Sequence, residues 1–347
     1  MRFYTKQHQF YCGVDLHARS MYICILDQAG QILLHRNLPA EPDAFLEAIK
    51  PYREDIVVCA ECMFSWYWLA DLCGGENIPF VLGHALYMKA IHGGKAKNDK
   101  IDSRKIAALL KAGLIPQAYV YPPEMRATRD LLRRRHYLMR RRADLLGHIQ
   151  NTNAQYNLPE FGRKIAYKTH RTGVAEQFSD PDVSMSVSAD LELIDHYDQL
   201  MKRLELFILK NARHHDPQAL YLLKTVPGIG MILSLAILYE VHDVSRFPTV
   251  GDFASYSRLV ACAKESAGKH YGTSGRKIGN IHLKWAFSEA AVIFLRANPL
   301  GMKYKQRLEH RYGKSKALSI LAHRLGRAVY FMLTRERAFD MKQFLNS

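Results

Sequence analysis

The sequence predicts an α/β domain at the N-terminus followed by a longer, mostly helical part. The first observation is a series of short apolar runs that alternate like strands, at Phe10–Leu16, Met21–Asp27 and Ile32–Leu38. The second is the helical spacing of apolar residues beyond residue 123. A chain of 347 residues has room for two or three domains. We expect these domains at residues 1–123, 124–216 and 217–347.

Strands and helices alternate through the rest of the first domain. Asp43–Tyr52 fits a short amphipathic helix, and Ile56–Ala60 fits a buried strand. Trp66–Leu72 reads as a helix, Pro79–Leu82 as a strand and Asp102–Lys111 as another helix. This alternation predicts a mixed sheet that helices cover on both faces.

The middle region is expected to form a coiled coil or a helical hairpin. A long helix starts near Glu124, and Leu131, Leu138 and Leu145 recur in it every seven residues. The polar, punctuated stretch Pro159–Ser188 predicts a loop or a mobile insertion. A second helix has apolar residues spaced by four and three, namely Leu193, Tyr197, Leu200, Leu204 and Phe207. It could pair with the first helix or with a partner subunit.

The last region is expected to be mostly α-helical from Pro217 onward. Val226–Gly230 separates two apolar helical stretches, Leu283–Asn298 is a further apolar helix, and basic helices follow over Pro299–Phe331. Gly228 and Gly230 could expose backbone N–H groups at a helix N-terminus, as a helix-hairpin-helix-like element does for a phosphate. A tight helix–helix turn explains the same glycines.

The balance of charge favours a polyanionic partner. Lys and Arg number 49 against 33 Asp and Glu, which gives a net charge of +16. We find neither an apolar run long enough to span a bilayer nor an apolar signal peptide, so we expect a cytosolic protein with no membrane partner. The six cysteines should then stay reduced, and the pair Cys59 and Cys62 is interpreted as packing.

Four acidic residues stand at the ends of predicted elements. Asp15 ends the first strand, Glu61 follows a later strand, and Asp99 and Asp102 lie where a helix begins. In a ribonuclease-H-like sheet, carboxylates at these places converge and need cations, for which Mg²⁺ (or Mn²⁺) is suited. Taken singly, Asp15 could be a turn residue, Glu61 a solvated acid and Asp102 a helix N-cap.

Basic residues gather in two places. Lys95, Lys97, Lys100 and Arg104 surround the two helix-start aspartates. Eight arginines lie between Arg126 and Arg142 against one acid, Asp130, and like charges at this density repel unless something neutralises them. We expect contacts with a nucleic-acid backbone from Arg133, Arg134, Arg135, Arg140, Arg141 and Arg142. The alternative is a solvated face of a coiled coil.

A polar stretch rich in small residues follows residue 264. It holds Ser266, Lys269, Ser274, Arg276 and Lys277, and we expect a loop there. Such a loop could bring an activated serine hydroxyl to a phosphodiester, or it could bind a phosphate through its basic residues.

Short stretches along nearly the whole chain resemble the DEDD-type transposases of bacterial insertion sequences, a group of bridge-RNA-guided recombinases. The matching stretches are Gly13–His17, Ala60–Glu61, Ser65–Leu69, Lys97–Asp102, Ala107–Leu110, Arg129–Arg135, Val226–Gly230, Arg246–Phe247, Lys264–Lys269, Lys277–Asn280 and Leu321–Arg324. They follow one another in the family's order.

The resemblance implies a RuvC-like N-terminal domain with Asp15, Glu61, Asp99 and Asp102 as a metal-binding tetrad. It also implies that Ser266 is a nucleophile that holds DNA covalently, with Ser274 as the less favoured alternative. A structured guide RNA would pair with donor and target DNA, while the protein would bind the nucleic-acid backbones. We expect a homo-oligomer, either a dimer or a tetramer.

Three other functions compete with this interpretation. A RuvC-like nuclease or junction resolvase would use the tetrad alone, with water as the nucleophile. A non-enzymatic nucleic-acid-binding scaffold would need none of the acids. An actin-like ATPase would also place an Asp after its first strand, but it needs glycine-rich phosphate loops that we do not recognise in this sequence.

Overall fold

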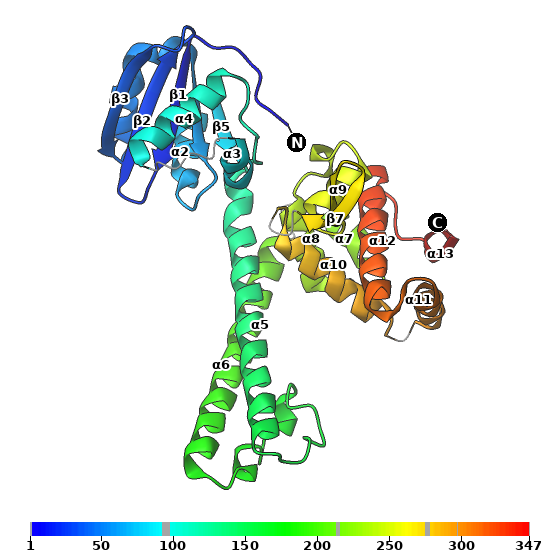
Figure 1. Cartoon of the computed structure of the whole chain (residues 1–347). Helices are drawn as coiled ribbons and strands as arrows, with labels where there is room; N and C mark the ends of the chain where they lie inside the picture. Colours follow the sequence, from blue (N-terminus) through cyan, green and yellow to red (C-terminus); the bar gives the residue numbers. More distant parts are fainter. Residues whose placement is uncertain (1, 92–97, 213–215, 275–277, 297, 347) are drawn as a thin grey trace. The chain divides into compact units, whose positions relative to one another are not determined.

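The computed structural model describes residues 2–91, 98–212, 216–274, 278–296 and 298–346. The chain divides into two compact units, Met1–Pro123 and Glu124–Ser347, and each is described by itself (Figure 1). The expected middle and last regions fall in one unit, so the separate boundary at residue 216 stays a prediction.

Unit 1 is built on a five-stranded mixed sheet with the order β3-β2-β1-β4-β5. The strands are β1 (Phe10–Leu16), β2 (Ser20–Asp27), β3 (Ile32–Pro39), β4 (Ile56–Glu61) and β5 (Phe80–Gly83). The first three form an antiparallel meander, and β4 pairs in parallel with both β1 and β5. The strands therefore lie close to the expected ranges, and the two central strands β1 and β4 end at the same edge.

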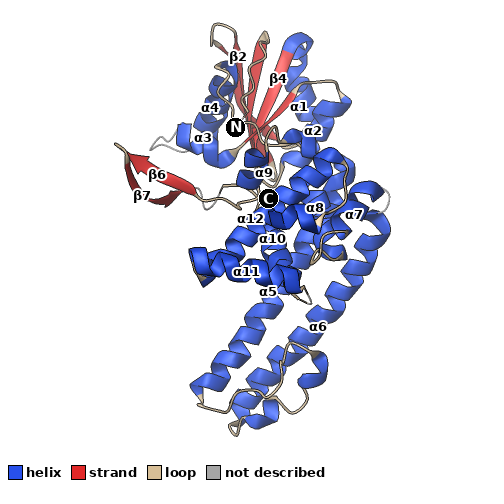
Figure 2. Cartoon of the chain, turned by 90° about the vertical axis from the view of Figure 1, so that its right-hand side faces the viewer, coloured by secondary structure: helices blue, strands red, loops and turns tan. Residues whose placement is uncertain are grey.

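Helices cover both faces of this sheet (Figure 2). On one face, α1 (Pro42–Ile49) and α2 (Trp66–Gly75) pack through Phe45 and Leu69 on alternate β1 residues such as Val14. On the other face, α4 (Asp99–Lys111) packs through Ile106 and Leu110 on Tyr11. The short helices η1 (Lys50–Asp55) and α3 (Ala85–Ile91) complete the unit. The alternation of β1 side chains thus sends residues 11, 13 and 15 toward α4.

Gly13 allows α4 to lie directly on β1. A Cβ atom at this position would come within 2.3 Å of Ser103 O and Ala107 N of the helix. No side chain can be accommodated there unless the helix backbone moves. This close approach brings the first turn of α4 to the end of β1 that carries Asp15.

Unit 2 begins with two long helices, α5 (Pro123–Gln155) and α6 (Pro181–Ala212). The segment between them contains η2 (Lys168–His170) and η3 (Ala175–Gln177), and its Ile165, Val174 and Phe178 are buried against Ile149 and Ile194 of the helices. The segment expected to be a mobile insertion is therefore packed. Residues 181–188 of this segment are helical and not a loop, because α6 begins at Pro181. Asp180, the residue before it, accepts hydrogen bonds from the backbone N–H groups of Asp182 and Val183.

The buried seam of α6 differs from the expected apolar stripe. Val187, Ile194, Met201 and Ile208 recur every seven residues and are buried. Leu193 and Phe207 of the expected stripe are 45% and 57% exposed. Both stripes have heptad spacing, and the spacing alone could not indicate which one faces the rest of the unit. A coiled coil stays a prediction.

The remainder of unit 2 is a helical domain around a large apolar core that includes Tyr239, Phe253, Phe287 and Leu321. Its elements are α7 (Pro217–Lys224), α8 (Met231–Val241), η4 (Val244–Arg246), α9 (Val250–Tyr256), α10 (Ile281–Phe294), α11 (Pro299–Tyr312), α12 (Lys314–Arg335) and α13 (Met341–Asn346). A hairpin of β6 (Cys262–Ser266) and β7 (Lys269–Ser274) replaces the loop expected around Ser266. In the described ranges, no helix has the length and apolar character needed to cross a membrane.

Candidate active site and basic surfaces

Asp15 and Glu61 lie next to each other at the shared edge of β1 and β4. Val14 pairs with Ala60 in the parallel register, and each acid is the next residue on its strand. Both acids follow residues that alternate between the faces, so both are directed to the side that α4 covers. The Asp15 side chain is 15% exposed.

Asp99 and Asp102 occupy the first turn of α4. Asn98 is the N-cap, and its side chain accepts a hydrogen bond from Ile101 N. The interpretation of Asp102 as an N-cap is therefore wrong. Acids in this turn are stabilised by the helix dipole. Asp102 Oδ1 also lies 3.6 Å from Lys105 Nζ.

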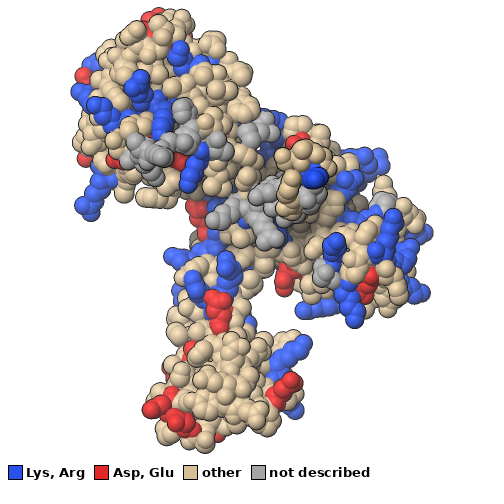
Figure 3. All heavy atoms as spheres, in the orientation of Figure 1, with Lys and Arg blue, Asp and Glu red and all other residues tan. Residues whose placement is uncertain are grey.

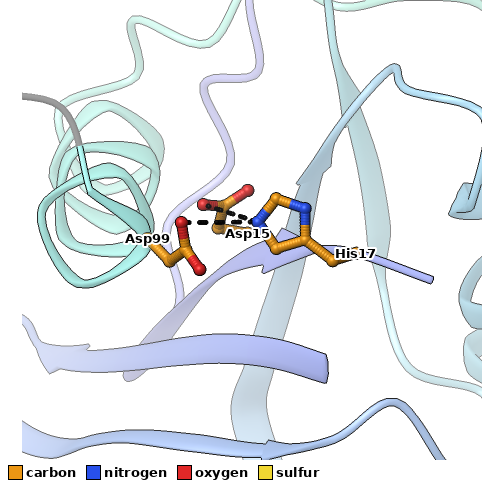
Figure 4. Close-up of side chains that lie close together, drawn as sticks. All are labelled: Asp15, His17 and Asp99. Atoms are coloured by element: carbon orange, nitrogen blue, oxygen red, sulfur yellow. Dashed lines mark ion pairs between the residues drawn. The ribbon is translucent and has the colours of Figure 1, made fainter. Parts of the chain in front are cut away.

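A histidine that the sequence analysis did not select completes a cluster with two of the acids (Figure 4). His17 Nε2 lies 3.6 Å from Asp15 Oδ2 and 3.5 Å from Asp99 Oδ1. One ligand atom from each of the three residues lies within 4.8 Å of the others. Glu61 and Asp102 are not in this three-residue group, although their backbones lie at the same edge. The signal for His17 was its place two residues after Asp15, since alternate residues of an extended chain share a face.

These donors suit a hard divalent cation. Two carboxylates provide the oxygen ligands that Mg²⁺ prefers, and an added imidazole nitrogen is a ligand that Mn²⁺ also accepts. Asp15, Asp99 and His17 would hold the ion; Glu61 ends the strand next to that of Asp15, and Asp102 lies in the same helix turn as Asp99. The close carboxylates also explain why a cation is needed, since like charges at this distance repel.

The basic residues around α4 are only partly described. Lys95 and Lys97 lie outside the described residues. Lys100 and Arg104 are exposed on the first two turns of α4, on the same helix as the aspartates. Their role in binding nucleic acid stays a prediction.

Ser266 lies beside the tight turn of the β6–β7 hairpin. It pairs with Lys269, and both residues are exposed. The two residues between them, Ala267 and Gly268, have φ values of 50° and 73°, the pattern of a two-residue hairpin turn. Figure 2 shows the hairpin extending away from the helices of its own unit. Ala-Gly is a weak turn signal compared with Asn-Gly, so the sequence did not predict this hairpin.

The other residues expected near Ser266 give a mixed result. Arg276 and Lys277 lie outside the described residues. Gly228 has a φ of +87°, and a Cβ there would lie 2.4 Å from Phe294 N of α10. Close packing of the turn on α10 therefore accounts for Gly228 without a ligand. Gly230 is the exposed N-cap of α8, and the helix-hairpin-helix interpretation stays a prediction.

Three of the six selected arginines of α5 are bound to acids of their own unit. Arg133 Nε lies 2.6 Å from Glu240 Oε1, and Arg142 Nε lies 2.6 Å from Asp198 Oδ1. Arg135 lies 2.8 Å from Glu205. The repulsion that the sequence analysis assigned to a nucleic-acid partner is thus relieved in part by acids of α6 and α8.

The other three arginines form an exposed face of α5. Arg134 and Arg141 place their guanidinium carbons 5.5 and 5.1 Å from the centre of the Tyr137 ring, and Arg140 is also exposed. Arg141 also makes an exposed ion pair with Asp144. We call Arg134, Tyr137, Arg140 and Arg141 the α5 basic face.

Glu240 of α8 is the centre of a buried polar network. It is 2% exposed and accepts hydrogen bonds from Arg129, Arg133 and Asn280. Burial by itself raises the pKa of Glu240, but the hydrogen bond from Arg133 and the charges of both arginines lower it to about 2. Asn280 is also the N-cap of α10, and its side chain accepts hydrogen bonds from the N–H groups of His282 and Leu283. The network therefore connects α5, α8 and the N-terminus of α10.

Comparisons with known proteins place the chain among transposases. A family model described as "Transposase", of the IS110 DEDD type, matches residues 12–157. A second, described as "Transposase IS116/IS110/IS902 family", matches residues 220–306. The first match contains the acidic cluster, and the second contains Ser266 and Glu240.

The sequence is similar to known transposases and insertion-element proteins over different lengths of the chain. The chain is 32% identical over 120 residues to the "Insertion element IS110 uncharacterized 43.6 kDa protein" of Streptomyces coelicolor, which covers 34% of the chain and 29% of that protein. It is 24% identical to the "Transposase for insertion sequence element IS1328" of Yersinia enterocolitica, over 87% of the chain and 86% of that protein. It is 23% identical to the "Probable family 20 transposase" of Pseudomonas aeruginosa, over 94% of the chain and 97% of that protein.

The mixed sheet with carboxylates at the ends of its central strands, together with these matches, defines an enzyme of the DEDD transposase class, whose nuclease-like domain implies a divalent metal. The chain belongs to the IS110 family of insertion-sequence transposases.

Proposed function

We propose that the chain moves an insertion sequence by cutting and rejoining DNA strands through a covalent bond to Ser266. The observation that carries this proposal is the position of Ser266, exposed beside the turn of a hairpin that extends from its unit. A DNA strand can therefore reach the Ser266 hydroxyl. Exposed Lys269 opposite Ser266 provides a positive charge near the phosphate.

The reaction is a balanced exchange of phosphodiesters. Ser266 Oγ forms a bond to phosphorus, the bond from phosphorus to a DNA oxygen breaks, and the released DNA hydroxyl takes up a proton equivalent to the one that serine loses. Attack by a hydroxyl of another strand then reverses the step and regenerates the serine. A hydroxyl is a weak nucleophile unless a base or neighbouring charge activates it.

The acidic cluster is proposed to hold Mg²⁺ or Mn²⁺ through Asp15, Asp99 and His17, joined by Glu61 and Asp102. When bound, such an ion would supply positive charge to neutralise a phosphodiester during transfer. The carboxylates would hold it at the sheet edge, and Lys100 and Arg104 of α4 would hold the DNA or RNA backbone.

A structured guide RNA is proposed to choose the donor and target DNA by base pairing. The α5 basic face supports a role in binding the nucleic-acid backbone, because Arg134 and Arg141 lie over the exposed Tyr137 ring and Arg140 is exposed on the same helix. Such a surface binds phosphates and stacks on bases without reading their sequence.

We also propose a homo-oligomer, a dimer or a tetramer, in which the exposed apolar residues of α6 pack against another copy of the chain. Leu193 and Phe207 are exposed at positions that continue a heptad repeat. Light scattering of Leu193→Glu should show a smaller particle than the unmodified chain, whereas Lys202→Glu on the same helix should not.

The deciding experiment incubates the full chain with Mg²⁺, the element's flanking non-coding RNA and labelled donor and target DNA. Denaturing gels should show a protein–DNA adduct that Ser266→Ala abolishes and that Ser274→Ala preserves. Asp15→Asn should lose metal-dependent cleavage. Cleavage without any adduct would mean that water is the nucleophile, as in a RuvC-like nuclease. Full activity of Asp15→Asn would argue against an enzymatic role for the cluster.

A further inference from the structure

A hollow of about 470 Å³ lies between α12 and the C-terminal segment of unit 2. One face of α12 forms one wall, and residues 337–344 form the other. The volume is within the roughly 300–1,000 Å³ typical of sites for small ligands. None of the residues in this hollow belongs to the acidic cluster, to the β6–β7 hairpin or to the α5 basic face.

The walls carry a strong excess of positive charge. Their basic residues are His323, Arg324, Arg327, Arg335 and Arg337. Asp340 is the single acid among the described lining residues. Its carboxylate already accepts hydrogen bonds from the backbone N–H groups of Lys342 and Gln343, where it caps α13. Figure 3 shows Lys and Arg gathered on the part of unit 2 that contains α11 and α12.

Burial and neighbouring charge shift the pKa values of two of these groups. Burial, and after it the charge of Arg327, lowers the pKa of both His323 and Arg324. Arg324 is therefore a partly desolvated cation beside Arg327, and the imidazole of His323 next to them favours its neutral form. An anion in the hollow would reduce the repulsion between these positive charges.

Aromatic rings line the same hollow. Phe331 and Phe339 are half-buried, and Arg335 lies over the Phe331 ring at 4.7 Å. Phe344 is buried, and the centre of its ring lies 5.3 Å from that of Phe339 and 5.5 Å from that of Phe294. This aromatic cluster anchors the C-terminal segment. Both half-buried rings thus keep part of their surface exposed beside the arginines.

We propose that this hollow binds one unpaired nucleotide of a single strand, with its phosphate against the arginines and its base against Phe331 and Phe339. Arginine forks pair with phosphate oxygens, and bases stack on aromatic rings whatever their sequence. A base within a duplex presents no face to such a pocket, so the strand must be unpaired. The strand can be DNA or RNA, because both share this chemistry.

The test uses the full chain and short single strands, of DNA or of RNA, that carry one iodouracil. After irradiation, mass spectrometry should map the crosslink to the peptides that contain Phe331 or Phe339. Arg327→Gln and Arg335→Gln should each lower the affinity of the strand by about tenfold, as expected when one charge-assisted contact is lost. Phe339→Leu, which keeps an apolar side chain, should lower the crosslink yield similarly.

Arg296→Gln is the matched control, because Arg296 is an exposed arginine of the same unit outside the hollow. It should leave the affinity and the crosslink unchanged. A crosslink with the DNA strand, the RNA strand or both supports the pocket and identifies its source. Crosslinks that map elsewhere, or arginine variants that bind like the control, would overturn the proposal. The Ser266 adduct assay is independent of this result, since the pocket residues take no part in strand transfer.

Discussion

Glu240 Oε2 and Arg129 Nε lie 3.0 Å apart, and their side chains are only 2% and 9% exposed, although one belongs to α8 and the other to α5. Arg133 and Asn280 bind the same carboxylate. The ion pair joins the long helix to the helical domain in the interior of unit 2. Breaking such a pair leaves a buried charge without compensation.

Glu240→Gln is therefore expected to lower the free energy of unfolding by about 3 kcal/mol, the scale for loss of one partner of a buried ion pair. Urea unfolding followed by circular dichroism measures this change. Asp144→Asn is the control, because Asp144 pairs with Arg141 on the exposed surface of α5 and should change stability by less than about 1 kcal/mol. Equal effects of the two changes would contradict a structural role for the Glu240 network.

The same carboxylate predicts a dependence of stability on pH. The pKa of Glu240 is lowered from 4.5 to about 2 in the folded chain, so the unfolded chain takes up a proton first as the pH falls. The stability from Glu240 is complete above the unfolded pKa and is lost between about pH 4.5 and pH 2. Across that window, the difference in unfolding free energy between the unmodified chain and Glu240→Gln should shrink. A constant difference would mean that Glu240 is not ionised in the fold.

Gly13→Ala should separate α4 from β1. The new Cβ would meet Ser103 O and Ala107 N at 2.3 Å, so the helix must move, at a cost of about 1–3 kcal/mol for overpacking. Because α4 carries Asp99, the affinity for Mn²⁺ should fall as well, which calorimetry measures. Gly74→Ala in the same unit has no atom within 4 Å of its added Cβ and should keep both properties. Normal Mn²⁺ binding by Gly13→Ala would mean that the helix position does not set the cluster.

His17→Ala should affect Mn²⁺ more than Mg²⁺. The imidazole nitrogen lies next to Asp15 and Asp99, and nitrogen is a better ligand for Mn²⁺ than for the harder Mg²⁺. Titration calorimetry should show a larger loss of affinity for Mn²⁺, on the order of tenfold. His8→Ala is the control, because this imidazole of the same unit contacts Tyr4 and Asp55 and lies outside the three-residue cluster. An equal loss for both ions would place His17 outside the coordination shell.

The α5 basic face and the paired arginines should behave differently toward nucleic acid. Replacing Arg134, Arg140 and Arg141 together with Gln should reduce the slope of log affinity against log salt by about three, roughly one for each lost phosphate contact. Replacing Arg133, Arg135 and Arg142 should lower the stability of unit 2 instead, since these side chains pair with its acids. Fluorescence anisotropy at several salt concentrations distinguishes the two sets. An unchanged salt slope in the first triple variant would remove the face from the binding surface.

The elements with strong local patterns could be predicted from the sequence. The strands at Phe10–Leu16 and Ile32–Pro39 and the helix at Trp66–Gly75 follow short-range alternation or helical periodicity. The same patterns placed Asp15, Glu61 and Asp99 at the ends of elements, where a parallel pair of strands brings acids together. The transposase family also followed from the order of short motifs, and the comparisons confirm it.

The sequence by itself thus determined the α/β unit, the helical remainder and the acids that meet at one sheet edge, because each depends on the spacing of neighbouring residues. Only the tertiary structure decided that His17 joins Asp15 and Asp99, that three arginines of α5 are neutralised internally and that α6 buries Ile194 rather than Leu193. These outcomes depend on partners far along the chain. A heptad stripe or a run of arginines has the same local pattern whether it faces a core, an acid or solvent, and the packing of distant elements makes the choice.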